Sequence, residues 1–295
     1  MRRLALVLAG LLAAVGSAQA ERARIITPAS KAQMKPAMRK NVRASVLVGD
    51  SDGSGVVLDR ARGLIATNAH VAEEAPAVVR TSDGTIVPVR EVIHAGPDAD
   101  VAFLRVGRLP KGTTDVTVDT ANLGKQQRVY GIASAEGFVK ADRVLGGQHV
   151  TDPKRFVRAH RKQIAPGSPT GAPLIALAEH LLANQGNVGY HVLTPGRVVT
   201  PEAIGVYGET QQTVVRTSMP NAPSASGGGV FSADSDAMVA LHVGGEAKRS
   251  QEIPMRLVVE AAKDGVAKGA GSKRGLAALK SWLAGVAPTG PSSTP

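Results

Sequence analysis

Three segments of the chain carry residues that together could cleave an acyl bond by nucleophilic attack. His70 follows the apolar run 64–67, Asp100 precedes the apolar run 101–104, and Ser226 stands in a glycine-rich stretch. A serine hydroxyl is a poor nucleophile at neutral pH, so it needs a neighbouring base to take its proton. A histidine can do this, and an acid can hold the imidazole in the required tautomer. The residue types therefore predict a Ser-His-Asp hydrolase, provided that the fold brings them together.

Two other residues compete for these roles. Asp98 lies close to Asp100, and we prefer Asp100 because it directly precedes the apolar run. Ser51 lies in Gly-Asp-Ser-Asp-Gly, which fits the nucleophile elbow of α/β-hydrolases. That motif needs a helix straight after the serine, whereas a β-type run follows here. We therefore interpret Ser51 as part of a hairpin loop and keep an esterase that uses it as a minor hypothesis.

Short strands must position the three residues. β-type runs broken by Gly, Asp and Pro are predicted at 44–48, 55–58, 64–67, 77–80, 86–93, 100–106, 128–133, 213–216, 229–231 and 238–243. Strands at this spacing favour an antiparallel barrel or sandwich. Apolar residues at helical spacing predict helices at 174–183, 255–267 and 276–283.

The chain resembles the trypsin-like serine peptidases, especially the bacterial Deg (high-temperature-requirement) proteases. Gly53-Ser54-Gly55 followed by Thr67-Asn68-Ala69-His70 matches the strand and "T-N-x-H" of that family, and the run from Asp100 to Leu104 matches its "D-[LV]-A-[LF]-L". The stretch from Ser224 to Gly228 matches "G-x-S-G-G" except at its first residue. The order His, Asp, Ser is also that of the family. The resemblance covers about 43–135 and 212–265.

This resemblance implies an all-β fold of two antiparallel six-stranded β-barrels with C-terminal helices. Residues 42–135 would form the first barrel and 136–268 the second, so His70 and Asp100 would face Ser226 across a cleft. The cleft would hold a peptide or unfolded protein, which adds as a strand along an exposed edge. The substrate-binding residues on that edge would be Leu241, His242, Val243 and Gly244.

The resemblance also implies an oxyanion hole. The backbone N–H groups of Ser224 and Ser226 would face the developing negative charge. The family usually has glycine where this chain has Ser224, and a side chain there disfavours the required peptide orientation. Gly229 stands where the family often has proline, a difference that affects the following strand and not the chemistry.

The remaining segments frame this domain. Residues 1–20 have a basic start, an apolar run and an Ala-Gln-Ala site, which predicts a signal peptide. We therefore expect export to the periplasm or medium of a bacterium, with no membrane anchor after cleavage. Residues 21–41 form a basic lead-in, about 138–211 a long insert of loops and a helix near the cleft, and 269–295 a helix with a disordered tail. About thirty residues after the protease-like region are too few for a PDZ domain.

Composition excludes several other functions. The 295 residues include no cysteine, which rules out thiol catalysis and cysteine-ligated metals. The net charge is +11, but the basic residues are mostly scattered, so we expect a solvated surface and no nucleic-acid partner. No motif predicts a cofactor or a metal. The sequence leaves the oligomeric state open, and it leaves one further hypothesis: a catalytically silent relative that binds peptides or exported proteins.

Overall fold

The chain is built mainly of β-strands. The computed structural model describes residues 24–26, 28–49, 53–73, 75–94, 99–134, 191–207, 210–219, 225–246 and 249–286. The predicted signal peptide, the predicted helix at 174–183 and the tail after 286 lie outside these ranges. Within them, none of the helices is long and apolar enough to cross a membrane.

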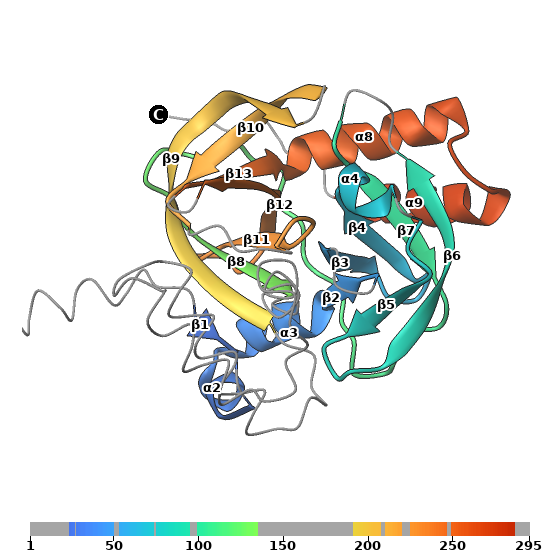
Figure 1. Ribbon diagram of the computed structural model, residues 1–295, viewed down its shortest axis with the longest axis horizontal. Coiled ribbons are helices and arrows are strands. Elements are labelled where there is room, and N and C mark those ends of the chain that lie inside the picture. The colour runs from blue at the N-terminus through green and yellow to red at the C-terminus, as the bar shows by residue number, and fades with distance from the viewer. Residues whose placement is uncertain are drawn as a thin grey trace, which may run out of the picture.

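The first barrel has six antiparallel strands (Figure 1). They are β2 (Ser45–Val48), β3 (Gly53–Asp59), β4 (Leu64–Thr67), β5 (Val78–Thr81), β6 (Ile86–His94) and β7 (Ala102–Val106). They close in the order β2-β3-β4-β7-β6-β5. Leu64, Ile65, Phe103 and Leu104 are fully buried. Consecutive strand residues point to opposite faces, so both faces of β4 and β7 are covered by other parts of the protein.

The second sheet has seven strands. They are β1 (Arg24–Ile25), β8 (Arg128–Ser134), β9 (His191–Tyr207), β10 (Thr210–Thr217), β11 (Gly229–Ser232), β12 (Met238–Glu246) and β13 (Arg249–Pro254). Their order is β1-β9-β10-β13-β12-β11-β8, and β8 also pairs with β9. Six of the strands therefore form a closed circuit, and β1 adds to it from outside. The all-β fold class with C-terminal helices is confirmed.

Two boundaries drawn from the sequence differ from the structure. We expected residues 42–135 to form the first barrel, but β8 pairs with β9 and β11 of the second sheet. We also expected the insert to run to 211, whereas β9 and β10 already belong to the sheet. Pro195 and Pro201 obscured β9, because proline cannot donate to a strand ladder and usually indicates an end. A sequence pattern also does not show which sheet a strand joins.

Helices connect and cover the barrels. The basic lead-in contains α2 (Pro28–Gln33) and most of α3 (Pro36–Ala44), and α4 (Ala69–Ala72) follows β4. Helix α8 (Met255–Lys268) leaves the second sheet after β13, and α9 (Lys273–Gly285) follows it. Figure 1 shows both C-terminal helices lying along the first barrel.

Named contacts fix these helices to the barrels. The rings of Trp282 in α9 and Phe103 in β7 lie 6.1 Å apart. In α3, Asn41 donates to the hydroxyl of Tyr130, which itself donates to Asp236 at 2.8 Å. Burial raises the pKa of Tyr130 above its ordinary value, and its bond to Asp236 raises it further. Tyr130 therefore stays a neutral donor.

The barrels meet at a glycine turn. Gly227 has a φ of +84°, and a Cβ placed on it would collide with the Ser54 carbonyl oxygen and the Thr67 hydroxyl. Ser54 also donates its N–H to the carbonyl of Ser226 at 2.7 Å. The turn before β11 thus packs directly on β3 and β4, and only glycine fits this conformation and this space.

Replacing this glycine therefore tests the contact between the barrels. Gly227→Ala should lower the free energy of unfolding by about 3 kcal/mol or more, through backbone strain and overpacking. Gly112→Ala is the matched control, because a Cβ there meets nothing within 4 Å. Urea unfolding of both variants measures the effect. Equal stability of Gly227→Ala and the control would contradict the described packing.

Glu91 links α9 to the first barrel in a pH-dependent way. Burial alone would raise the pKa of this carboxyl, but hydrogen bonds from Ser272 and Arg105 outweigh burial and hold the pKa below its ordinary value of 4.5. A lowered folded-state pKa contributes stability above pH 4.5, which is lost as the pH falls through the folded-state value.

We therefore expect Glu91→Gln to lower the free energy of unfolding by about 1 kcal/mol at pH 7. The difference from the unmodified protein should shrink as the pH falls below about 4.5. Urea titrations at pH 7, 5 and 3.5 give the comparison, and Glu260→Gln on the exposed side of α8 is the control. A difference that stays constant over this range would show that ionised Glu91 does not hold α9.

Candidate active site

His70 and Asp100 form a hydrogen-bonded pair. His70 Nδ1 lies 2.8 Å from Asp100 Oδ2, and the His70 backbone N–H donates to Asp100 Oδ1 at 3.0 Å. The Asp100 side chain is 6% exposed and that of His70 is 31% exposed. A carboxylate only accepts, so Nδ1 carries the proton and Nε2 is left as the basic nitrogen when the ring is neutral.

The register of two strands explains this pairing. β4 and β7 are antiparallel, with Thr67 opposite Ala102. Residues just after β4 must therefore lie beside residues just before β7, which brings His70 near Asp100. The short helix α4 then turns the His70 backbone N–H toward the carboxylate. The two motif residues meet because both stand at the same end of neighbouring strands.

Ser226 stands in a tight turn. Gly228 donates its N–H to the Ala225 carbonyl at 2.8 Å, which closes a four-residue turn with Ser226 and Gly227 at its centre. The positive φ of Gly227 is the one that a type II turn requires at its third position. Gly227 also donates to the His242 carbonyl, and His242 donates to the Gly228 carbonyl, both at 2.8 Å. Strand β12 thus supports the turn from behind.

A second glycine, Gly53, lies against both Ser226 and the segment that follows His70. A Cβ on Gly53 would lie 2.6 Å from the methyl groups of Val71 and 3.0 Å from the Ser226 carbonyl oxygen. Val71 directly follows His70 in the chain. Val71 and the Ser226 carbonyl therefore both lie against Gly53, on the side where a Cβ would stand, at the junction of the two barrels.

The Ser226 hydroxyl donates to the carbonyl of Val243 at 2.7 Å. A hydroxyl has a single proton, so here that proton is not donated to an imidazole. Rotation about one side-chain bond redirects it. Ser226 as a residue is only partly buried.

The predicted substrate strand is more enclosed than we expected. Leu241, His242, Val243 and Gly244 are all buried, and both backbone groups of His242 are engaged by the Ser226 turn. An incoming peptide therefore cannot pair with His242 in this conformation. The role of Leu241, Val243 and Gly244 stays a prediction.

The side chain of His242 belongs to a buried polar network. Its Nδ1 lies 2.9 Å from Glu252, whose side chain is fully buried. Glu252 also accepts hydrogen bonds from Thr217 at 3.1 Å and from Ser250. Three donors on one carboxylate compensate for its burial. This network lies behind the Ser226 turn and braces β10, β12 and β13.

Sequence reasoning missed Glu252 and two amide side chains that hold Asp100. Asn68 donates to the Asp100 carbonyl at 2.9 Å, and Gln212 accepts from the Asp100 N–H at 3.0 Å. Asn68 stood inside a motif, whereas nothing in the sequence around Gln212 indicated a long-range partner. The oxyanion-hole donor expected at Ser224 lies outside the described residues. Within those residues, no three His, Asp or Glu side chains gather closely enough to hold a metal ion.

A solved structure shares this fold. An inactive form of the Rv3671c protease of M. tuberculosis has a TM-score of 0.51 and 16% identity, covering 81% of this chain and 96% of that one. The apo protease domain of MamO from Magnetospirillum magneticum has a TM-score of 0.49 and 15% identity, covering 76% and 97%. At 16% identity, the likeness to the Rv3671c protease shows the fold alone. No curated protein matches the sequence.

A family model gives the assignment. The trypsin-like peptidase domain matches residues 53–241, which is more than half of the chain and includes His70, Asp100 and Ser226. The match begins at the strand that receives the Ser226 turn and ends in β12. The chain therefore belongs to the family of trypsin-like peptidase domains.

Proposed function

We propose that the protein is an exported serine endopeptidase that uses His70, Asp100 and Ser226 as a catalytic triad. The observation that carries this proposal is the two-point contact of His70 with Asp100, through Nδ1 and the backbone N–H. Such a contact fixes the tautomer and the direction of the ring, as a general base requires. Export rests on the apolar segment at residues 1–20.

Each step of the reaction has a residue available. His70 Nε2 takes the proton of the Ser226 hydroxyl as the oxygen attacks the peptide carbonyl, and a tetrahedral intermediate forms. The protonated His70 then gives that proton to the leaving amine, which leaves an acyl-enzyme on Ser226. Water repeats the sequence, with His70 again as base, and releases the second product. Asp100 stabilises the imidazolium in both halves.

The oxyanion needs donors in the same place. The Ser226 backbone N–H lies in the turn that Gly227 and Gly228 hold against β12, and we propose it as one donor. The N–H of Ser224 would be the second. One donor of this kind contributes roughly 3–4 kcal/mol to the transition state.

One observation favours a second candidate, a silent relative that binds peptides. The Ser226 hydroxyl donates to Val243 and is not directed at a base in this conformation. In a working enzyme, substrate must favour the rotamer in which the hydroxyl donates to His70. In a silent relative, the bond to Val243 persists when peptide is bound.

Labelling with a fluorophosphonate separates the candidates, because this reagent reacts with an activated serine. We expect labelling of the folded protein, its loss in Ser226→Ala, and a fall of about 10⁴-fold or more in the labelling rate of His70→Ala. Casein hydrolysis should fall in parallel. Ser218→Ala, which changes a serine outside the triad, is the control for loss of a hydroxyl.

The other outcomes are equally specific. Folded protein that does not label at any pH between 5 and 9 would reject the endopeptidase and favour the peptide-binding relative. Labelling that survives Ser226→Ala but disappears in Ser51→Ala would instead support the α/β-hydrolase type of nucleophile.

A further inference from the structure

The main chain at Asp100 lies outside the strand ladders. The pairing of β7 with its neighbours begins at Ala102, so Asp100 precedes the hydrogen-bonded part of the strand. A buried backbone N–H or carbonyl needs a partner, and here the neighbouring strands supply none to Asp100. Side chains must therefore hold this peptide in place.

Two side-chain amides do so, one from each barrel. Asn68 donates to the Asp100 carbonyl at 2.9 Å from the segment just before His70. Gln212 accepts from the Asp100 N–H at 3.0 Å and comes from β10, in the second barrel. The N–H can only donate, so the Gln212 atom that faces it is the oxygen. The backbone of Asp100 is thus held from both sides.

Both amides are buried in an unfavourable way. Asn68 is fully buried and Gln212 is 8% exposed. The remaining polar atom of each, Asn68 Oδ1 and Gln212 Nε2, has no hydrogen-bond partner among the described residues. Burial of an unpaired amide atom destabilises a fold, and an apolar side chain of similar size avoids that loss. The bond to Asp100 is the interaction that these amides gain in return.

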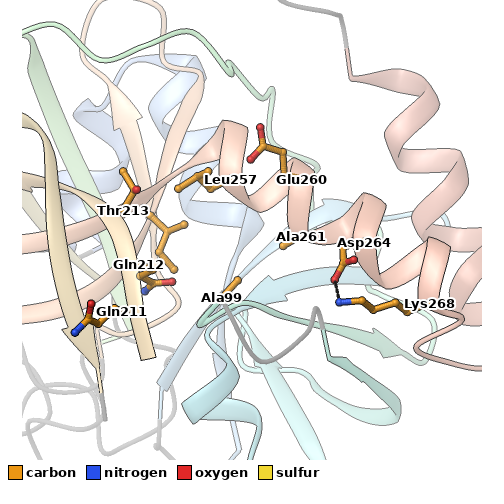
Figure 2. Close-up of a pocket in the computed structure, with 10 residues that line it drawn as sticks. Ala99, Gln211, Gln212, Thr213, Leu257, Glu260, Ala261, Asp264 and Lys268 are labelled. Atoms are coloured by element: carbon orange, nitrogen blue, oxygen red, sulfur yellow. Dashed lines mark ion pairs between the residues drawn. The ribbon is translucent and has the colours of Figure 1, made fainter. Parts of the chain in front are cut away.

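A cleft lies beside Ala99, the residue directly before Asp100. A cleft of about 430 Å³ separates β10 from α8, and Ala99, Gln212 and Thr213 are among the residues that line it. Figure 2 shows Ala99 and Gln212 near each other on one side of this cleft, with Glu260 and Asp264 on α8 across from them. The cleft leaves one side of Ala99 open, and the two hydrogen bonds to the Asp100 backbone are directional restraints that packing on this side does not replace.

We infer that Gln212 is a positioning residue for the acid of the triad. It joins the second barrel, which carries Ser226, to the backbone of Asp100, and so sets the direction of the carboxylate that orients His70. This inference rests on the proposed function. The inference adds to the proposed function the contact by which the second barrel positions Asp100 and, through it, His70 in the first barrel.

Three substitutions test the inference. Gln212→Met keeps the size and removes the acceptor. Gln212→Glu keeps an acceptor oxygen and adds a negative charge. Gln211→Met changes the neighbouring exposed residue, which lines the same cleft, and is the matched control. The rate of fluorophosphonate labelling at Ser226 is measured from pH 5 to 9, and the His70 Nδ1 proton is observed by NMR.

For Gln212→Met we expect labelling to slow by about 10- to 100-fold, because the base loses its alignment. Its Nδ1 proton signal should broaden or move upfield. Gln212→Glu should recover most of the rate, with the acidic limb of its pH curve moved to higher pH, since an added negative charge favours the imidazolium. Gln211→Met should match the unmodified protein in both measurements.

Unchanged labelling and an unchanged Nδ1 signal in folded Gln212→Met would overturn the inference while leaving the endopeptidase intact. An unmodified protein that does not label would reject the endopeptidase, and the Nδ1 signal would still decide whether Gln212 orients His70. If Gln212→Met does not fold, Gln212→Asn replaces it. That variant keeps the amide but withdraws it from Asp100 by one methylene, and the same two results are expected.

Discussion

The structure depends on the contact between the Ser226–Gly227 turn and the strands that carry Ser54 and Thr67. Here the backbone of the second barrel lies directly against the backbone of Ser54 and the hydroxyl of Thr67 in the first. A glycine with positive φ makes this approach possible. The contact fixes the position of Ser226 relative to β4. This strand ends at Thr67, three residues before His70. The geometry of the site is therefore a consequence of how the two barrels are joined.

Polar side chains hold both halves of the site by binding the backbone or the strands that carry them. Asn68 from the first barrel and Gln212 from the second hold the backbone of Asp100. In the second, the Glu252 network holds β12, whose His242 supports the Ser226 turn. Hydrophobic burial stabilises the barrels but does not fix directions, whereas hydrogen bonds are directional. This division explains why buried polar groups gather around the site of a protein with a mostly aliphatic core.

The sequence allowed most strands to be predicted, because strands depend on local patterns, whereas the roles of the motif residues stay predictions. The run Leu64–Thr67 is short, mostly apolar and leads into a motif, and its strand has those bounds in the structure. Strand partners were not predictable, so β8 was placed in the wrong barrel and β9 was missed behind its prolines. Gln212 and Glu252 were missed for the same reason. Their roles depend on residues that are distant in sequence, and no local pattern indicates such a contact.

The placement of the C-terminal helices affects when, during synthesis, the first barrel receives its full cover. Helix α9 is the last element described, yet its Trp282 and Ser272 contact the first barrel. A chain made from its N-terminus onward can therefore form β2 to β7 early, but these strands lack their outer cover until α9 has been made. The turn with Ser226 also arrives late. In the proposed peptidase, the nascent chain would thus hold Asp100 and His70 before Ser226 is made, and until then it would lack one of the three residues of the triad.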